Sequence, residues 1–369
     1  MARYFVYGYY GFRNFGDDLL LEAVVSNIRR HDPDAEFVIR AREPVNAWRG
    51  DGQIRFLLAE SILENRQGNR LLRFLRYRHA LVHEARRCDV MVVGGGTLFI
   101  DKGAINWSLL FLHEAVRAAR RRGRKIVVMG VAIDILAHPL SLWLTRRIFA
   151  YADFAALRDA LSLAYFQSCA SSPRLTADLA WLKNVLPERE SRRGERRAVG
   201  LNFIDYYRTT VNSEDGHRAY RASLQRLIER HRNEWDFHLI ALQPGVGQRD
   251  DWFADEFLAL VPDGKILCVE DDASLAAVLR QLDALVTTRF HMALLAAKSG
   301  LPTCIVDHEL KLTSLAQDIQ LPAIPLMEFV LGEMADPIER LATWDDVATR
   351  RAVMRMENRA EDNFAWIHK

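Results

Sequence analysis

Short apolar runs alternate with longer segments of helical periodicity along most of the chain. The runs are apolar on both faces and helical segments lie between most of them, which is typical of parallel strands covered by helices on both sides. The pattern therefore predicts an α/β protein built on parallel sheets. The predicted strands are residues 4–9, 36–40, 89–93, 125–131 and 153–157, then 198–203, 237–242, 265–269, 284–287 and 303–306.

A charged break divides this pattern into two halves. Residues 184–197 are rich in arginine and glutamate and include a proline and a glycine, as is typical of an exposed linker. We therefore expect one Rossmann-like domain over residues 1–183 and a second over 198–345. An amphipathic helix in residues 346–369 is expected to pack back on the first domain. Ligands of such sheets bind beyond the carboxyl ends of the strands, so two domains facing each other predict a ligand-binding cleft.

Composition narrows the classes of function. The chain has 369 residues, enough for two domains, and a formal net charge of +2 that gives no argument for nucleic-acid binding. The first apolar run is too short for a signal peptide, and no run of about 18 uncharged apolar residues occurs, so we expect a cytoplasmic protein. The four cysteines form no CxxC pair and no metal-binding motif occurs, so we expect reduced core thiols and neither a metal nor a cofactor.

A glycine-rich loop follows the first predicted strand and leads into a helix. It contains Gly11, Asn14 and Gly16, followed by Asp17 and Asp18. Glycines allow a tight turn and a close backbone approach, and either aspartate is suited to cap the helix. The spacing differs from the dinucleotide-binding fingerprint, and two acidic residues at the helix start disfavour a phosphate there. The segment is then either a capped turn or a loop that holds a sugar or orients a carboxylate.

Two further motifs follow predicted strands of the first half. Arg158 and Asp159 come directly after one strand, and Asp178 lies farther along the chain. Asp159 is expected to cap a helix, and Asp178 either ends a strand or faces the ligand. The other motif is a glycine triplet, which forms either a tight turn or a backbone cradle for a ligand. The triplet is Gly94, Gly95 and Gly96, expected at the end of its strand.

The strongest signal follows a strand of the second half. Thr287 or Thr288 is expected to cap a helix that Gly300 ends, which puts Arg289 and His291 in its first turn. A cation there is unfavourable unless an anion joins it, because the helix dipole and the free amides already favour negative charge. Arginine offers a planar fork to a carboxylate or phosphate, and histidine donates a proton near neutral pH. We predict an anion site, against the alternative of a surface arginine and a core histidine.

Lys311 follows the next predicted strand and is expected at the same sheet edge as Arg289. It would supply a second cation for the same anion. The alternative is a solvated charged loop around Lys311.

A separate basic segment, residues 66–87, carries seven arginines and one glutamate beside a rough apolar stripe. Such a segment is either an ordinary exposed helix or one that contacts anionic lipid. The second alternative predicts peripheral contact with the inner face of a membrane.

Together these motifs resemble the polysaccharide pyruvyl transferase family over most of the chain, from Gly8 to about Leu321. The order of the motifs and the Arg-x-His step after a strand carry the resemblance. The matching motifs are Gly11 with Asn14-Phe15-Gly16-Asp17, Asp89 with the glycine triplet, Arg158-Asp159, Thr176-Ala177-Asp178, Arg289-Phe290-His291, Gly300-Leu301-Pro302 and Lys311.

Members of that family are similar to GT-B glycosyltransferases in fold and use phosphoenolpyruvate to form a ketal on two hydroxyls of one sugar. The resemblance implies a donor side in the second domain, where Arg289, Lys311 and Thr288 bind phosphoenolpyruvate with help from Arg158. It implies that His291 binds or activates the donor, as an acid or as a phosphate ligand. On the acceptor side the glycine loops would contact the sugar.

Asp17 or Asp178 is the expected base for the sugar hydroxyl, because both are acidic groups at strand ends of the first domain. The acceptor would be a saccharide of a cell-envelope polysaccharide or exopolysaccharide, either lipid-linked or nucleotide-linked. The alternatives are a GT-B glycosyltransferase that uses a nucleotide sugar and a non-catalytic sugar-binding protein.

Overall fold

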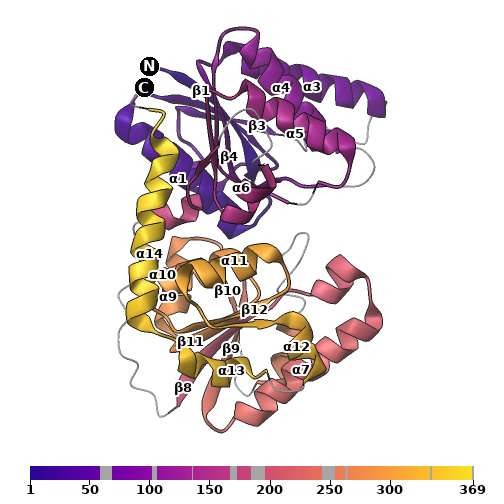
Figure 1. The fold of residues 1–369 in the computed structure, drawn as a ribbon, viewed down its shortest axis with the longest axis vertical. Coiled ribbons are helices and arrows are strands. Elements are labelled where there is room, and N and C mark those ends of the chain that lie inside the picture. The colour runs from indigo at the N-terminus through magenta and orange to yellow at the C-terminus, as the bar shows by residue number, and fades with distance from the viewer. Residues whose placement is uncertain are drawn as a thin grey trace. The chain divides into compact units, whose positions relative to one another are not determined.

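A computed structural model describes most of the chain and divides it into two compact units (Figure 1). The first comprises Met1–Phe12, Asp17–Leu182 and Glu357–Lys369, and the second comprises Arg13–Gly16 and Lys183–Met356. Most of the charged stretch at 184–197 lies outside the described residues. These residues are 1–58, 69–101, 106–134, 136–166, 173–183, 196–242, 254–261, 265–332 and 335–367.

The first unit is built on a seven-stranded parallel sheet with the strand order β3-β2-β1-β4-β5-β6-β7. Every pairing in it is parallel, as the apolar runs predicted. The pattern missed two edge strands, β3 and β7. The strands are β1 (Arg3–Tyr10), β2 (Glu36–Ala41), β3 (Ile54–Leu58), β4 (Val90–Phe99), β5 (Lys125–Ile133), β6 (Phe154–Leu157) and β7 (Arg174–Leu175).

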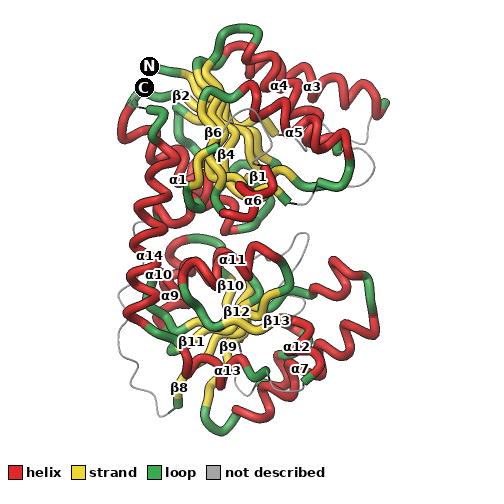
Figure 2. The backbone as a smooth tube through the Cα atoms, in the orientation of Figure 1, coloured by secondary structure: helices red, strands yellow, loops and turns green. Residues whose placement is uncertain are grey.

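Helices cover both faces of this sheet. Figure 1 shows α3, α4 and α5 side by side on one face and α1 on the other, and Figure 2 shows the strands between these helical layers. Right-handed crossovers require this division, because the chain moves one way along the sheet from β1 to β3 and the other way from β4 onward. The helices are α1 (Phe15–His31), α3 (Arg70–Arg87), α4 (Trp107–Arg120), α5 (Pro139–Tyr151) and α6 (Ala160–Phe166), with 3-10 turns at Asn46–Trp48 and Leu179–Leu182.

The second unit repeats this architecture on a six-stranded parallel sheet with the order β10-β9-β8-β11-β12-β13. The five predicted strands are present, and the short edge strand β13 was missed. Cys268 at the end of β10 is exposed, so the prediction that the cysteines are core residues is wrong for it. The strands are β8 (Arg197–Asn202), β9 (Trp235–Ala241), β10 (Ile266–Cys268), β11 (Ala284–Thr287), β12 (Thr303–Asp307) and β13 (Ala323–Pro325).

The helices of the second unit again form two layers. In Figure 1, α9, α10 and α11 lie on one face of the sheet, and α7, α12 and α13 lie on the other. The helices are α7 (Glu214–His231), α9 (Asp272–Arg280), α10 (Phe290–Lys298), α11 (Leu310–Ile319), α12 (Leu326–Leu331), α13 (Pro337–Arg340) and α14 (Asp346–Glu361), with a 3-10 turn at Leu341–Thr343 and a wider turn at Tyr207–Val211. Over the described residues, no helix is both long and apolar enough to cross a bilayer.

The residues that follow α14 belong to the first unit. Asn363 is fully buried there, donates to the carbonyl of Ala177 at 2.9 Å and accepts from the hydroxyl of Thr176 at 2.9 Å. Lys125 donates to the carbonyl of Trp366 at 2.8 Å and lies 5.3 Å from the centre of its indole ring. The segment from Asn363 to Trp366 is therefore anchored in the first unit.

Candidate functional site

In each sheet the strand order reverses at one point, between β1 and β4 in the first unit and between β8 and β11 in the second. Ligands of open parallel sheets bind beyond the carboxyl ends of the strands at such reversals, because the flanking loops diverge and leave a crevice. The motifs singled out in the sequence follow these strands. A ligand-binding site is therefore expected at the reversal point of each sheet.

In the second unit, buried hydroxyls hold the carboxyl ends of β8 and β11 together. Thr287 donates to the Asn202 side-chain oxygen at 3.0 Å and accepts from the backbone N–H of Arg289 at 2.9 Å. Thr288 accepts from the N–H of Ile204 at 3.0 Å. The side chains of Asn202, Thr287 and Thr288 are at most 1% exposed. This network fixes the backbone from which Arg289 leaves the sheet.

The prediction that a threonine caps α10 is wrong. The cap position is Arg289 itself, with an extended backbone at φ −106° and ψ 126° and no side-chain hydrogen bond to the first turn. The threonine hydroxyls serve the adjoining strand β8 instead. Arg289 therefore stands immediately before the helix, and His291 lies in its first turn. The predicted helix end is correct, since Gly300 takes a positive φ of 73° just beyond it.

The side chain of His291 is closely packed within the second unit. By its contacts the short segment Arg13–Gly16 belongs to this unit, and a Cβ added to Gly16 would lie 2.1 Å from His291 Nδ1. Any side chain at Gly16 would displace the imidazole. The ring of Phe290 stands edge-on to His291 with the centroids 5.4 Å apart. The glycine at position 16 is thus required for space beside the histidine.

A second group of polar residues follows β12. Lys311 lies 2.8 Å from the Glu309 carboxylate, and His308 lies 3.5 Å from the same oxygen. Burial is the largest cause that lowers the pKa of His308 to about 4; the positive charges of Lys311 and Arg289 act in the same direction, and Glu309 opposes them. The positive charges of Arg289 and Lys311 therefore both act on the His308 imidazole, which is neutral at pH 7.

Sequence reasoning missed Tyr206 and gave no role to His308, although the segment around Lys311 had been singled out. The ring of Tyr206, in the loop after β8, lies 4.8 Å from that of His308. The only sequence signal for either residue is its position in a loop that follows a strand, which neighbours without a role share. The carboxyl edge of the second sheet therefore carries two cations, a neutral imidazole and a phenol.

In the first unit, the loop after β1 is held by a carboxylate. Asp18 accepts from the N–H of Gly11 at 2.9 Å, and Gly11 has a positive φ of 71° with the backbone of Glu43 against its α-carbon. Burial raises the pKa of Asp18 to about 6 despite that hydrogen bond. The prediction that Asp17 or Asp18 caps α1 is wrong, because the helix begins at Phe15 and both aspartates lie inside its first turn.

The glycine triplet does not end its strand, which corrects the prediction. Strand β4 continues through it to Phe99, because β5 continues to pair with it. Gly95 and Gly96 have φ values of 74° and 77°, and a Cβ on Gly95 would lie 2.8 Å from the Leu20 side chain. A Cβ on Gly96 would lie 3.6 Å from the Asp17 carboxylate. The triplet therefore lets α1 approach the sheet closely and brings Asp17 beside the backbone of β4.

Arg158 and Asp178 form a buried ion pair. Their side chains are 4% and 2% exposed, with 2.8 Å between Arg158 NH1 and Asp178 Oδ2. Arg158 also donates to the hydroxyl of Thr97 at 3.2 Å, and the other oxygen of Asp178 accepts from the N–H of Ala180 at 2.9 Å. Asp159 caps α6 as predicted, accepting from Ser162 at 2.7 Å. The pair ties β4 and β6 to the chain that follows β7.

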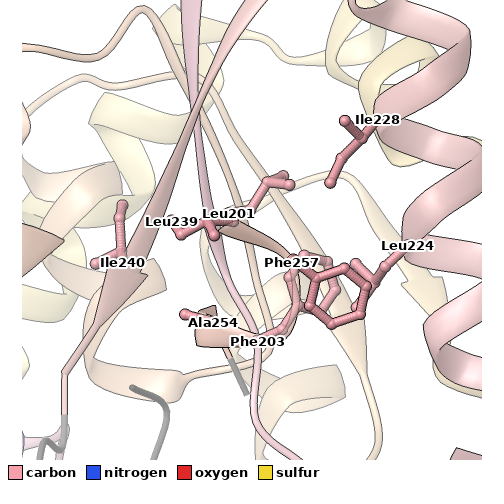
Figure 3. A pocket seen from close by; sticks show the side chains of 8 residues that line it. All are labelled: Leu201, Phe203, Leu224, Ile228, Leu239, Ile240, Ala254 and Phe257. Atoms are coloured by element: carbon pink, nitrogen blue, oxygen red, sulfur yellow. The ribbon is translucent and has the colours of Figure 1, made fainter. Parts of the chain in front are cut away.

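Two other features of the second unit resemble binding sites at first sight. Figure 3 shows a small hollow beside β8, β9 and α7 in which every lining side chain is apolar, so it is a gap in the core that offers no polar anchor. Its lining is Leu201, Phe203, Leu224, Ile228, Leu239, Ile240, Ala254 and Phe257.

One group of possible metal ligands occurs among the described residues: His231, Asp336 and Glu339. Asp336 accepts from His231 at 2.7 Å and from Arg230 at 3.1 Å, and it caps α13 through the N–H groups of Ile338 and Glu339. A guanidinium already neutralises the carboxylate. The group is therefore an ion-pair and capping network.

Comparison with known proteins places this geometry in a family. The family model of polysaccharide pyruvyl transferases matches residues 14–309, which include the reversal point of the second sheet with Arg289 and His291, and strand β4 of the first sheet. The chain belongs to the polysaccharide pyruvyl transferase family. No curated protein sequence matches it.

Solved structures similar to the chain show its fold. A UDP-GlcNAc 2-epimerase from Neisseria meningitidis bound to UDP-GlcNAc is 10% identical with a TM-score of 0.62, and each chain is covered completely. The lipopolysaccharide outer core galactosyltransferase WaaB is 14% identical with a TM-score of 0.57, again over 100% of both chains. The glycosyltransferase SnogD from Streptomyces nogalater is 15% identical with a TM-score of 0.53, covering 100% of this chain and 99% of its own. This polysaccharide pyruvyl transferase family member thus has the GT-B fold of two Rossmann-like sheets.

Proposed function

We propose that the protein transfers a pyruvyl group from phosphoenolpyruvate to two hydroxyls of one sugar, in a cell-envelope polysaccharide or its precursor. The observation that carries the proposal is that Arg289 follows β11, at the strand-order reversal of the second sheet, and Lys311 follows the neighbouring strand β12, and that both charges act on His308. Phosphoenolpyruvate bears a carboxylate and a phosphate, so it needs several cations and hydrogen-bond donors. The N–H groups at the start of α10 add donors that favour negative charge.

The reaction requires proton transfer and stabilisation of a leaving anion. A proton adds to the methylene carbon of phosphoenolpyruvate, and one sugar hydroxyl attacks the resulting oxocarbenium-like carbon and loses its proton. The bond between that carbon and the phosphate oxygen then breaks, inorganic phosphate leaves, and the neighbouring hydroxyl closes the ketal with loss of its own proton. One proton is consumed and two are released, of which the phosphate takes up one near neutral pH. No step oxidises or reduces a carbon overall.

On the donor side, we assign Arg289 and Lys311 to the anionic groups of phosphoenolpyruvate and His291 to the acid. A positioned acid contributes about 10²–10⁴-fold to a rate. The hydroxyl of Thr288 already bonds the backbone of the loop after β8, so its role is to position Arg289. Arginine and helix N–H groups stabilise the departing phosphate because their charge and dipoles are oriented before the reaction.

On the acceptor side, Asp17 and Asp178 remain the two candidate bases. Asp17 lies beside the backbone at Gly96, where a ligand can approach closely. One carboxylate oxygen of Asp178 accepts a hydrogen bond from Arg158, and the other accepts one from the backbone N–H of Ala180. These contacts favour Asp17 as the base, and they favour Arg158 as a residue that positions the β4 strand rather than a donor ligand.

A second candidate function is glycosyl transfer from a nucleotide sugar. One observation favours it: a structure with the same fold is bound to UDP-GlcNAc. A diphosphate would use the same cations as phosphoenolpyruvate. The two functions differ in the donor that stabilises the protein.

Thermal shift with each donor tests the proposal. A ligand at 100 times its dissociation constant stabilises the folded state by about 2.7 kcal/mol, which is readily measured. We expect phosphoenolpyruvate to raise the melting temperature and UDP-GlcNAc to leave it unchanged. Arg289→Ala should abolish the shift, and Arg289→Lys should retain part of it because the charge remains without the planar fork.

Arg218→Ala is the matched control, since Arg218 is an exposed arginine on α7 of the same unit. It should bind phosphoenolpyruvate like the unmodified protein. Stabilisation by UDP-GlcNAc alone would support glycosyl transfer instead. Donor stabilisation that survives in Arg289→Ala would overturn the assignment of Arg289.

A further inference from the structure

The face of the first unit that carries α4 and α5 contains a groove that the proposed reaction does not use. It has a volume of about 640 Å³ and lies between the C-terminal half of α4 and the facing side of α5. Arg117 and Arg120 contribute from α4, Arg121 from the position just after it, and Arg147 from α5. The rest of the lining is His113 and the aromatic rings of Trp143 and Tyr151.

The charges of this groove are only partly balanced. Arg117 lies 3.4 Å from Glu114, and Arg120 lies 2.7 Å from Asp153. Glu114 is shared with a further arginine, Arg78, at 2.7 Å. Across the described part of the chain, Arg121 and Arg147 have no carboxylate within ion-pair distance. The groove therefore holds more positive charge than the protein neutralises.

Arg147 is held ready to receive an anion. It donates to the hydroxyl of Tyr151 at 2.7 Å, and its guanidinium lies 5.0 Å from the centre of that ring. This contact orients the guanidinium without neutralising it. A planar guanidinium presents paired N–H donors that match phosphate oxygens. A fixed arginine of this kind is typical of a phosphate site.

His113 supplies an independent sign of a missing ligand. Its side chain is 6% exposed, and within the described residues both ring nitrogens are buried without a hydrogen-bond partner. The nearest carboxylate oxygen, on Glu114, is 3.9 Å from Nδ1. Burial lowers the pKa of His113, so the ring is neutral and offers one donor and one acceptor. A buried polar group with no partner is costly, and a ligand oxygen in the groove would remove that cost.

Apolar side chains are exposed at the N-terminal ends of the same helices. Since α3, α4 and α5 run in the same direction in one layer, these ends lie along one edge of it (Figure 1). Phe74 packs edge-on against Trp107 with the ring centroids 4.6 Å apart, which links α3 to α4. Singly exposed apolar residues are ordinary, but a row of large ones beside a basic groove is not. The exposed side chains are Leu71, Leu72, Leu75, Trp107, Leu140 and Trp143.

We propose that the groove between α4 and α5 binds the phosphate of an anionic phospholipid head group, so that this helical layer docks on a membrane surface. The uncompensated arginines and His113 would contact the phosphate, and the exposed leucines and tryptophans would reach the acyl region. A free phosphate would satisfy the cations but would leave the apolar row in water, which favours the lipid. The sequence-based interpretation of residues 66–87 places the membrane contact on α3 alone. The groove instead places the binding of the lipid phosphate on α4 and α5. This proposal does not depend on pyruvyl transfer.

Co-sedimentation with vesicles tests the proposal. The full chain should bind vesicles of phosphatidylglycerol and phosphatidylcholine at low salt, and vesicles of phosphatidylcholine alone should leave it in the supernatant. Replacing Arg117, Arg121 and Arg147 together by Gln should lower the partition coefficient by about a hundredfold, because basic residues at an anionic surface act roughly additively. The control changes an equal charge in the other unit, on the exposed arginines Arg218, Arg351 and Arg355, and should bind like the unmodified protein.

Two further measurements separate the lipid from other sources of phosphate. His113→Phe replaces the imidazole by a somewhat larger apolar ring without unsatisfied nitrogens, so it should raise the melting temperature without vesicles and weaken vesicle binding. Glycerol 1-phosphate in solution should not release the protein from vesicles. Release by glycerol 1-phosphate would show a soluble-phosphate pocket and overturn the lipid assignment. Equal vesicle binding by the triple groove variant and the control, or no binding by the unmodified protein, would overturn the site itself.

Discussion

The buried pair of Arg158 and Asp178 gives the sharpest test of which carboxylate acts in the reaction. Asp178→Asn keeps the size of the side chain and its bond to the N–H of Ala180 but removes the charge that faces Arg158. If the pair is structural, this change destabilises the first unit and affects turnover only through folding. If Asp178 is the base, turnover falls while the melting temperature stays.

The magnitude follows from burial. Removing one partner of a buried ion pair costs about 3–5 kcal/mol, because the other charge is left without its partner. The lower end applies here, since Arg158 keeps the Thr97 hydroxyl at 3.2 Å and the Asp159 carboxylate at 3.7 Å. For a unit of this size about 3 kcal/mol corresponds to a fall in the melting temperature of roughly 6–12 °C.

Differential scanning calorimetry measures the effect on the transition of the first unit. Arg158→Met combined with Asp178→Asn should cost less than the sum of the two single changes, with a coupling of about 1–3 kcal/mol. Arg218→Gln breaks an exposed ion pair on α7 and should change stability by less than about 1 kcal/mol. An unchanged melting temperature in Asp178→Asn, with turnover lost, would refute the structural reading and identify the base.

Three further predictions concern single positions. Gly95→Ala should lower the free energy of unfolding, measured with urea, by about 1–3 kcal/mol, because its φ is 74° and the new methyl group would meet Leu20. Gly52→Ala is the control and should leave the free energy of unfolding unchanged, because the space around Gly52 is open. Burial raises the pKa of Asp18 to about 6, so the folded state binds more protons than the unfolded state between about pH 4 and 6, and stability should fall as the pH rises through that window. Asp18→Asn should remove that slope, and a slope that persists in the variant would assign it to another group. His291→Asn should keep the melting temperature and lower turnover by about 100-fold, whereas a large loss of stability with normal turnover would make it a core histidine.

Much of the fold was predictable because parallel strands buried on both faces leave continuous apolar runs. The edge strand β3 escaped because only Leu57 is buried in it and the exposed Arg55 interrupts the short apolar run at Ile54–Leu58. Strand β13 escaped because three residues ending in a proline read as a turn. Edge strands are specified by the neighbour they pair with, and that neighbour is distant in the sequence.

The site was predictable in its residue types and only partly in its local geometry. The cations followed from strand ends and helix starts, which the sequence marks with Arg289 and Lys311. The cap of α10 did not, because Thr287 bonds to Asn202 of β8 and Thr288 to Ile204 in the loop after it, and nothing near the threonines in the sequence indicates these partners. The groove on α4 and α5 was not predictable for the same reason. His113 is notable only because no described residue gives its buried ring nitrogens a hydrogen-bond partner, and the sequence cannot show that.

A product assay tests the central claim most directly. The purified protein is incubated with phosphoenolpyruvate and a cell-envelope glycolipid fraction, and inorganic phosphate and glycan mass are followed together. We predict that phosphate is released in equal amount to glycans that gain the mass of one pyruvate less one water, and that Arg289→Ala abolishes both signals while Arg218→Ala keeps them. Glycans that instead gain a sugar residue from a nucleotide donor, with phosphoenolpyruvate left intact, would contradict the account.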